Sequence, residues 1–330
     1  MPIISLSEMT NGQEGDLFVL MTVKEELTTR DGKPYFKVAF RDHAREVNFP
    51  IWHDSPWGAD CRDAWQPGTF YKVRGVFRDT NYGPQLELRK IREVCGADEA
   101  DGFSPAMCLA QSRFDAREMF DELVAIAREK IEEPALRQLV VDVLEKNKGE
   151  LLILPAATRN HHAFVGGWLE HVLSVTRTSV FLANKYDQDY PEMRPRLSKS
   201  LVVAGAILHD IGKLREIEPQ PQGAQYTASG NLIGHILQGR DIVREAAAAE
   251  GLPGDLLLRL EHIIVSHQRL PEWGSPKPPM TPEALIVHYA DDLDAKYQMM
   301  VCILREDTNP GPVTSKKNVL YQKLYRGQEF

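Results

Sequence analysis

The first part of the chain alternates apolar and polar residues with a period of two from residue 16 to residue 93. Phe36, Val38 and Phe40 would share one face of a strand, because successive side chains in a strand point to opposite faces. The alternation predicts strands at 17–23, 35–41, 45–51, 70–77 and 86–91. Turns are expected at 31–32 and 82–84, and a short helix at 55–65.

Five strands with a helix between the third and the fourth follow the order of an OB-fold barrel. Other small barrels would produce the same pattern. We assign residues 1–96 to this barrel and expect it to bind nucleic acid.

From Phe114 onward the apolar period becomes 3.6 residues, which indicates helices. Pro134 in a first turn and Ser229 as an expected N-cap mark two helix starts. Helices are predicted at 114–131, 134–148, 163–186, 198–211, 229–250, 254–268 and 282–303. The predicted fold is therefore multidomain: an N-terminal β-barrel, a Gly/Asp-rich linker (97–112), an all-α domain (113–310) and a basic C-terminal tail (311–330).

The composition is that of a cytoplasmic protein. The 330 residues, 43% hydrophobic and 26% charged, suffice for two domains with real cores. Residues 1–16 lack the features of a signal peptide, and the longest apolar run, 201–208, is too short to span a membrane. The four cysteines lie far apart without a metal-binding spacing, which favours reduced thiols.

The net charge of −8 lies mostly outside residues 1–96, which are close to neutral. The tail is locally basic. Charge by itself therefore neither supports nor excludes a polyanionic substrate.

Histidine and aspartate concentrate in the helical half, which contains eight of the ten histidines. His209-Asp210 ends the apolar run 201–208 and precedes Gly212-Lys213. Imidazole and carboxylate together suit Mn²⁺, Fe²⁺, Mg²⁺ or Zn²⁺. Further donors come from separate predicted helices, as expected for a site inside a bundle: His171, His235, His267 and Asp291.

Helical geometry distinguishes among neighbouring side chains. His262 and His267 point about 140° apart, so only one faces the site, and we choose His267. Among the carboxylates of the last predicted helix, Asp292 is expected in solvent. His288 fits either a place beside the ligands or a packed, hydrogen-bonded histidine.

Several short motifs occur along the chain: Asn160-His161-His162, Gly166-Gly167, Leu169-Glu170-His171, 208–213, 230–235, Ser266-His267, 272–279, His288-Tyr289-Ala290-Asp291 and 293–296. Together these segments resemble the YhaM-type 3′–5′ exoribonucleases, which join an N-terminal OB domain to an HD domain. The resemblance covers most of residues 16–300, and the glycine-rich His235 segment and the Trp-Gly-Ser-Pro-Lys-Pro-Pro loop are its most specific parts.

The resemblance implies two divalent ions, with Mn²⁺ favoured and Mg²⁺, Co²⁺ or Fe²⁺ as alternatives. It implies one ion on His171, His209, Asp210 and Asp291, and a second on His235 and His267, with Asp210 bridging. Gln268 stands where the family often has a second histidine.

Two ions would activate a water and neutralise charge on a phosphodiester. We expect Asp210, Lys213 and His162 to be catalytic, with Lys213 on a phosphate oxygen; its alternative role is to complement a helix C-terminus. His162 lies near a helix start beside Arg159, where a phosphate could bind, although capping would explain it equally.

Single strands are held by aromatic stacking and basic side chains. Candidates for these contacts are Tyr35, Lys37, Arg41, Trp52, Arg74, Arg159, Trp273 and Lys277. For each of them a solvated or packed surface residue is the competing interpretation.

The predicted function is metal-dependent 3′–5′ exonucleolytic hydrolysis of single-stranded RNA, or single-stranded DNA, to nucleoside 5′-monophosphates. One alternative is an HD-domain phosphohydrolase of free nucleotides or cyclic dinucleotides. A second is a non-catalytic single-strand-binding protein with a structural HD domain. No membrane partner is expected, and the sequence leaves homo-oligomerisation open.

Overall fold

The computed structural model describes residues 3–80, 83–158, 162–220, 223–307 and 309–327. The chain forms two compact units, one of Met1–Gln111 with Gln220–Gly223 and one of Ser112–Pro219 with Ala224–Phe330. We describe each unit by itself.

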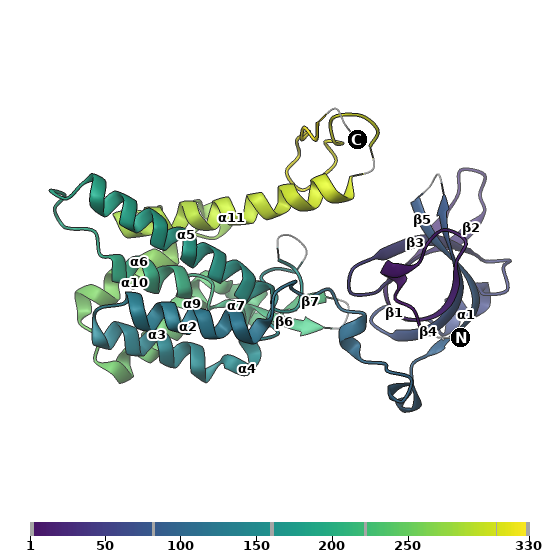
Figure 1. The fold of residues 1–330 in the computed structure, drawn as a ribbon, viewed down its shortest axis with the longest axis horizontal. Helices are drawn as coiled ribbons and strands as arrows, with labels where there is room; N and C mark the ends of the chain where they lie inside the picture. The colour runs from purple at the N-terminus through teal and green to yellow at the C-terminus, as the bar shows by residue number, and fades with distance from the viewer. Residues whose placement is uncertain (1–2, 81–82, 159–161, 221–222, 308, 328–330) are drawn as a thin grey trace. The chain divides into compact units, whose positions relative to one another are not determined.

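The first unit is an antiparallel five-stranded barrel (Figure 1). Its strands are β1 (Glu14–Thr28), β2 (Pro34–Arg41), β3 (Glu46–Trp52), β4 (Phe70–Thr80) and β5 (Gly83–Glu93). Their order is β3-β2-β1-β4-β5, and contacts between β3 and β5 close the barrel. Helix α1 (Gly58–Asp63) lies between β3 and β4 in the chain, so the predicted OB-type order is confirmed.

The barrel core follows from the alternation in the sequence. Phe36, Val38 and Phe40 of β2 are buried inside the barrel, whereas Lys37 between them points outward. β1 differs, because Phe18 and Leu20 on its outer face are buried as well.

The segment after β5 covers that outer face. Phe103 and Cys108 pack with Phe18 and Leu20 in a small separate cluster, and His43 N–H donates to Met107 O (2.9 Å). The residues that the sequence assigns to a linker, 97–112, are therefore largely part of the compact barrel unit, which extends to Gln111. Burying four apolar side chains outweighs the Gly/Asp-rich composition that suggested a linker.

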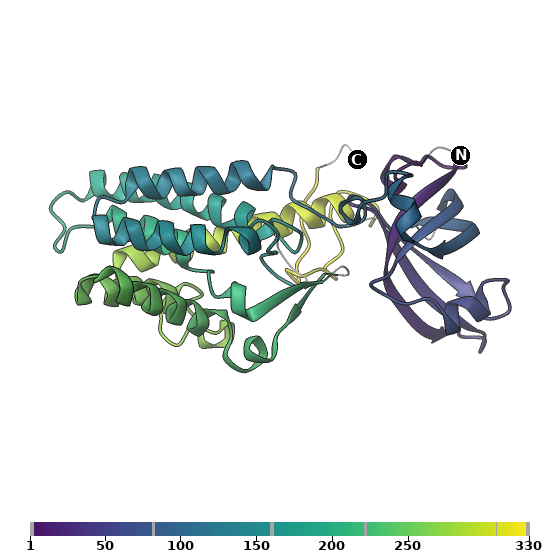
Figure 2. The same cartoon turned by 90° about the horizontal axis from the view of Figure 1, so that it is seen from below.

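The second unit is a helical bundle (Figures 1 and 2). Its helices are α2 (Ala116–Lys130), α3 (Pro134–Lys146), α4 (Lys148–Leu151), α5 (Gly167–Asp189), α6 (Lys199–Leu208), α7 (Lys213–Glu216), α8 (Ala228–Ile233), α9 (His235–Glu250), α10 (Gly254–Ser266) and α11 (Pro282–Glu306). Helix α6 is central: every residue from Ser200 to Leu208 is buried, against α2, α3, α5, α10 and α11. The helical bundle confirms the predicted class of this half of the chain.

Three local features differ from the prediction. A short hairpin, β6 (Ile217–Gln220) and β7 (Gly223–Tyr226), lies within the helical half. The predicted helix 229–250 is two helices that break at Gly234, whose φ of 80° is left-handed and suits glycine. Thr227, not Ser229, is the N-cap, because its hydroxyl accepts from the N–H of Gly230 (2.8 Å).

None of the helices in the described ranges combines the length and apolarity that crossing a bilayer requires.

Candidate metal centre

His209 and Asp210 follow directly after the last turn of α6. The Nε1–H of Trp168, a fully buried residue of α5, donates to the carbonyl of Asp210 (3.0 Å). On the other side Gly212 touches α9: a Cβ built there would lie 1.9 Å from the carbonyl oxygen of His235. The buried end of α6 is thus held by α5 and α9, which carry two further histidines.

One oxygen of Asp210 belongs to a first donor group, together with His171, His209 and Asp291. Asp210 Oδ2 lies 3.6 Å from the Nε2 atoms of both His171 and His209. Asp291 Oδ1, from α11, lies 3.2 Å from His171 Nε2 and 3.8 Å from His209 Nε2. Three helix segments, α5, α11 and the end of α6, therefore direct four donor atoms at one point.

The other oxygen of Asp210 belongs to a second donor group. Asp210 Oδ1 lies 3.3 Å from His235 Nε2 and 3.7 Å from His267 Nε2. Gln268 reaches the same place, since its Nε2 lies 3.3 Å from His235 Nε2. The amide of Gln268 thus contacts a predicted ligand directly.

Each of the four rings is oriented through its Nδ1 atom. His209 donates to Ala206 O (2.8 Å), and His267 donates to Ile264 O (2.7 Å). His171 donates to Asp294 (2.7 Å) and His235 to Glu216 (2.9 Å). These bonds place the proton on Nδ1 and leave the four Nε2 atoms to face the two donor groups, as metal-ligating imidazoles require.

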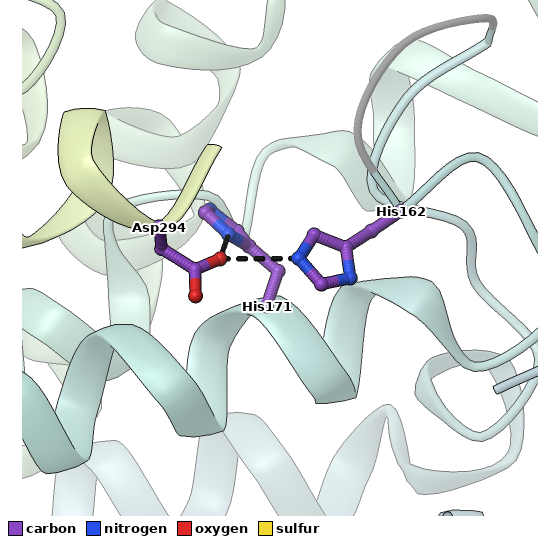
Figure 3. Close-up of side chains that lie close together, drawn as sticks. All are labelled: His162, His171 and Asp294. Atoms are coloured by element: carbon purple, nitrogen blue, oxygen red, sulfur yellow. Dashed lines mark hydrogen bonds and ion pairs between the residues drawn. The ribbon is translucent and has the colours of Figure 1, made fainter. Parts of the chain in front are cut away.

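Asp294 is not a donor of the first group, but its carboxylate contacts one of the donors, His171 (Figure 3). Its Oδ2 accepts from His171 Nδ1 and also lies 3.1 Å from His162 Nε2, and Ser174 Oγ donates to its Oδ1 (2.5 Å). His162, His171 and Asp294 would satisfy the spacing of a third metal group. Their close contacts are explained by hydrogen bonds, however, so we interpret Asp294 as the carboxylate that orients His171.

Glu216 plays the same part for the second donor group. One oxygen of its carboxylate accepts both from the backbone N–H of His235 (2.8 Å) and from the ring Nδ1 (2.9 Å). Sequence reasoning missed Glu216 altogether and assigned no role to Asp294. Asp294 could have been found, because it lies one turn from Asp291 on the same face of α11; nothing in the sequence signals Glu216.

Burial and nearby charges shift the pKa values of Asp210 and His171 in opposite directions. Burial alone would raise the pKa of Asp210, but Lys213 and the surrounding histidines hold it well below its usual range. Burial would lower the pKa of His171, but Asp291 and Asp294 outweigh it and raise the pKa to about 9. Burial lowers the pKa of His267 to about 3, with His209 adding to the effect. Burial likewise lowers the pKa of His209, so that His171, between two carboxylates, differs from the other buried histidines of the site.

A divalent metal would suit these residues. Asp210 Oδ1 and His267 Nε2 are buried and lack a hydrogen bond to any residue that the structure describes. Unsatisfied buried polar atoms are costly, and here the two atoms lie 3.7 Å apart. Nitrogen and oxygen donors fit the borderline and hard cations named above. That these residues are metal ligands stays a prediction.

Lys213 is buried, and its Nζ donates to Asp210 Oδ2 (2.5 Å). The ammonium group of Lys213, which the sequence predicts to be catalytic, is thus hydrogen-bonded to the carboxylate that both donor groups share. His162 is also buried, and its backbone is left-handed (φ 49°). A Cβ at Gly167 would lie 2.0 Å from the carbonyl oxygen of His162, so the close packing of this turn depends on a glycine.

His262, His288 and Asp292 lie where packing or pairing with a neighbour explains them. His262 Nε2 accepts from the N–H of Met280 (2.8 Å), and His288 Nδ1 donates to His267 O (2.6 Å). Asp292 pairs with Lys296 (2.7 Å) at the surface.

The loop 271–280 lies beside the second donor group. Ser275 Oγ accepts from the N–H of Gln268 (3.0 Å), and Gly274 approaches Ile236. Trp273 is half-exposed with Lys296 above its ring (5.8 Å to the centroid), and Lys277 is exposed. Arg159, the remaining predicted contact in this unit, lies outside the described residues.

The predicted contacts of the barrel occupy its outer face. Tyr35 and Trp52 are directly opposite each other on β2 and β3, with ring centroids 5.3 Å apart. Lys37 and Arg41 follow on the same face of β2. Arg74, on β4, makes two bonds of 2.7 Å to Asp16 and would have to leave it to reach a phosphate.

Because Glu216 and Asp294 each orient a histidine of one donor group, we expect a mutation of either carboxylate to weaken metal binding at that group alone. Glu216→Gln should weaken Mn²⁺ binding to the second donor group by about 10–100-fold, because the ring of His235 loses its charged acceptor. Asp294→Asn should weaken the first donor group by a similar factor. Isothermal titration of the metal-free protein with Mn²⁺ measures both.

Glu218→Gln is the matched control, since Glu218 is exposed two residues further along the chain. If either variant lost affinity equally for both Mn²⁺ ions, the assignment of one carboxylate to each group would be contradicted.

Two solved structures resemble part of this chain, both of them domains of replication protein A from Methanococcus maripaludis. The solution structure of its second OB-fold domain is 14% identical, covers 28% of this chain and 94% of that chain, and has a TM-score of 0.22. A crystal structure of a domain of the same protein is 11% identical with the same coverage and a TM-score of 0.23.

The family model of the HD domain matches residues 168–296. That range contains all six predicted metal ligands together with Lys213, Glu216 and Asp294. HD domains are typically metal-dependent phosphohydrolases. The helical unit therefore contains an HD domain, built around the donor atoms described above.

Proposed function

We propose that this protein is a metal-dependent 3′–5′ exonuclease that hydrolyses single-stranded RNA, and single-stranded DNA as a second substrate, to nucleoside 5′-monophosphates. The observation that carries the proposal is the position of Asp210, whose two oxygens each face a separate group of histidines. Such an arrangement suits two neighbouring metal ions, and many enzymes that cleave phosphodiesters use a two-metal site. The direction of cleavage rests on the family resemblance.

Two divalent ions held by His171, His209, Asp210 and Asp291 and by Asp210, His235 and His267 would activate a water and neutralise charge at phosphorus. We assign Lys213, the buried cation beside Asp210, to a non-bridging phosphate oxygen, where it stabilises developing negative charge. We assign His162 to a contact with the same phosphate. Asp294 keeps both His162 and His171 oriented.

The loop 271–280 supports a role in holding the terminal nucleotide. Trp273 offers a half-exposed ring for stacking, and Lys277 and Lys296 add positive charge near it. Because Ser275 is hydrogen-bonded to Gln268, which touches His235, the loop is linked to the second donor group. We expect Trp273 and the loop 271–280 to accept any base, since every base has a face on which an aromatic ring can stack.

Digestion of a 5′-labelled single-stranded RNA with Mn²⁺ tests the proposal. The wild type should produce a ladder that shortens from the 3′ end and release nucleoside 5′-monophosphates. Asp291→Ala should be inactive, because it removes a donor of the first group. Asp255→Ala should match the wild type, because this carboxylate is exposed in the first turn of α10.

The outcomes separate the alternatives. RNA that is bound but stays whole with Mn²⁺, Mg²⁺ and Co²⁺ would exclude the nuclease. Turnover of free nucleotides or cyclic dinucleotides alone would then identify a different phosphohydrolase, and binding without any turnover would identify a single-strand-binding protein.

Trp52→Ala should weaken the binding of single-stranded RNA by about 1–3 kcal/mol, because it removes one half of the Tyr35–Trp52 ring pair. Fluorescence anisotropy in EDTA at fixed salt measures binding without cleavage. Tyr190→Ala is the control, since Tyr190 is an exposed aromatic residue at the end of α5. Unchanged affinity in Trp52→Ala would remove this face from the binding surface.

A further inference from the structure

Helix α11 is apolar on two opposite sides. Its inner side, with Ala284, Val287 and Ala290, is buried in the bundle core. Its outer side carries a second row of apolar residues, which we call the α11 stripe. The stripe consists of Leu285, Tyr289, Leu293, Tyr297, Met300, Val301 and Leu304, all of them exposed.

The spacing of the stripe is that of a packing ridge. Its residues recur every three or four positions, so they form a continuous row along the helix. A helix that is apolar on all sides is normally buried on all sides. Figure 1 shows α11 running alongside α5, which covers only part of it.

The exposed area is large enough for a stable interface. Leu293 is 58% and Tyr297 66% exposed. With about 200 Å² for a whole large apolar side chain, the stripe exposes roughly 700 Å², more than the few hundred Å² usual for a patch on a monomer. A standard protein interface buries about 800 Å² on each partner.

The order of residues along the stripe is nearly symmetric about positions 294–295. Leu285 and Leu304 lie at equal distances from this centre, as do Tyr289 and Met300, and Leu293 and Tyr297 flank it. Beside the stripe, Asp292 and Lys296 stand on either side of the same centre. A two-fold axis through this point would bring apolar residues of the two copies together and place each Asp292 near the Lys296 of the other copy.

We propose that the α11 stripe is a dimer interface, on which a second copy of this chain packs its own α11 in antiparallel orientation. The aliphatic residues and the neighbouring Asp292 suit a protein surface better than a polyanion, whose backbone needs cationic contacts. Lys296, which lies above the ring of Trp273, connects the edge of the interface to the loop 271–280. Dimerisation would thus stiffen the helix that supplies part of the metal centre.

Light scattering after size-exclusion chromatography tests the proposal on the full chain. The wild type should have twice the chain mass of 37.3 kDa. Leu293→Glu and Tyr297→Glu should each have the single-chain mass with unchanged circular dichroism, because both residues are exposed. Leu258→Glu is the matched control: Leu258, on α10, is 63% exposed but lies outside the stripe, and this variant should remain a dimer.

Cross-linking tests the antiparallel geometry. In a Cys95→Ser, Cys302→Ser background, a mixture of Leu285→Cys and Leu304→Cys chains should join through a short bismaleimide, whereas Leu285→Cys alone should not. A single-chain mass for the wild type at every concentration up to about 100 μM, where even weak dimers form, would overturn the proposal, as would dimers that persist in both glutamate variants. So would a monomer in which Tyr297→Glu weakens RNA binding, since the stripe would then belong to nucleic acid.

Discussion

Asp210→Asn is expected to lower the rate of RNA hydrolysis by about a thousandfold or more. Asp210 is the residue whose oxygens face both donor groups, so replacing one of these oxygens with an NH₂ group removes a ligand from one group and the negative charge from both. Charge stabilisation by metal ions contributes several kcal/mol to such reactions, and every 1.4 kcal/mol corresponds to about a factor of ten. Single-turnover digestion of labelled RNA with saturating Mn²⁺ measures the loss.

Titration with Mn²⁺ distinguishes the role of Asp210 from that of the ligands that belong to one donor group only. Asp210→Asn should weaken both steps of Mn²⁺ binding, whereas Asp291→Asn should weaken one. If Asp210→Asn kept one step at wild-type affinity, Asp210 would not be shared between two ions.

A double variant separates chemistry from folding. Asp210→Asn leaves the buried ammonium of Lys213 without its carboxylate partner, and breaking a buried pair costs about 3–5 kcal/mol. Asp210→Asn with Lys213→Met should regain stability while staying inactive. Recovery of activity together with stability would place the catalytic carboxylate elsewhere.

Gly212→Ala should have the second large effect, on both stability and activity. The added Cβ would lie 1.9 Å from His235 O and 2.5 Å from the backbone nitrogen of Gly239, and neither backbone atom can move without shifting α9. We expect a loss of about 3 kcal/mol in the free energy of unfolding, at the upper end of overpacking costs. Thermal unfolding followed by circular dichroism should show a midpoint lower by about 6–12 °C.

The same substitution should displace His235 from Asp210. Mn²⁺ binding to the second donor group should therefore weaken by about 10–100-fold even where the variant is fully folded. Gly149→Ala is the matched control, because Gly149 lies in α4 with open space around its Cβ position. A stable Gly212→Ala protein with normal metal binding would show that the contact between Gly212 and α9 does not position His235.

The sequence alone predicted most of the elements, because each element depends on a local pattern. Period two in residues 16–93 and period 3.6 beyond residue 114 decide strand or helix, and Pro134 starts its helix as expected. The apolar run 201–208 predicted a buried helix that ends at His209-Asp210, and α6 is that helix. The six predicted ligands lie in one cluster, since apolar helix faces pack inward and carry their polar end residues with them.

Only the tertiary structure decided which groups stand behind the ligands and which surfaces stay uncovered. Glu216 reaches His235 because the chain turns after α7 and breaks at Gly234, and nothing local in the sequence connects the two residues. The covering of β1 by Phe103 and Cys108 also depends on a return of the chain across the barrel. The sequence has apolar residues on more than one side of α11 and does not show which of them are covered. Only the packing against α5 and α6 shows that one side is buried in the bundle while the α11 stripe stays exposed.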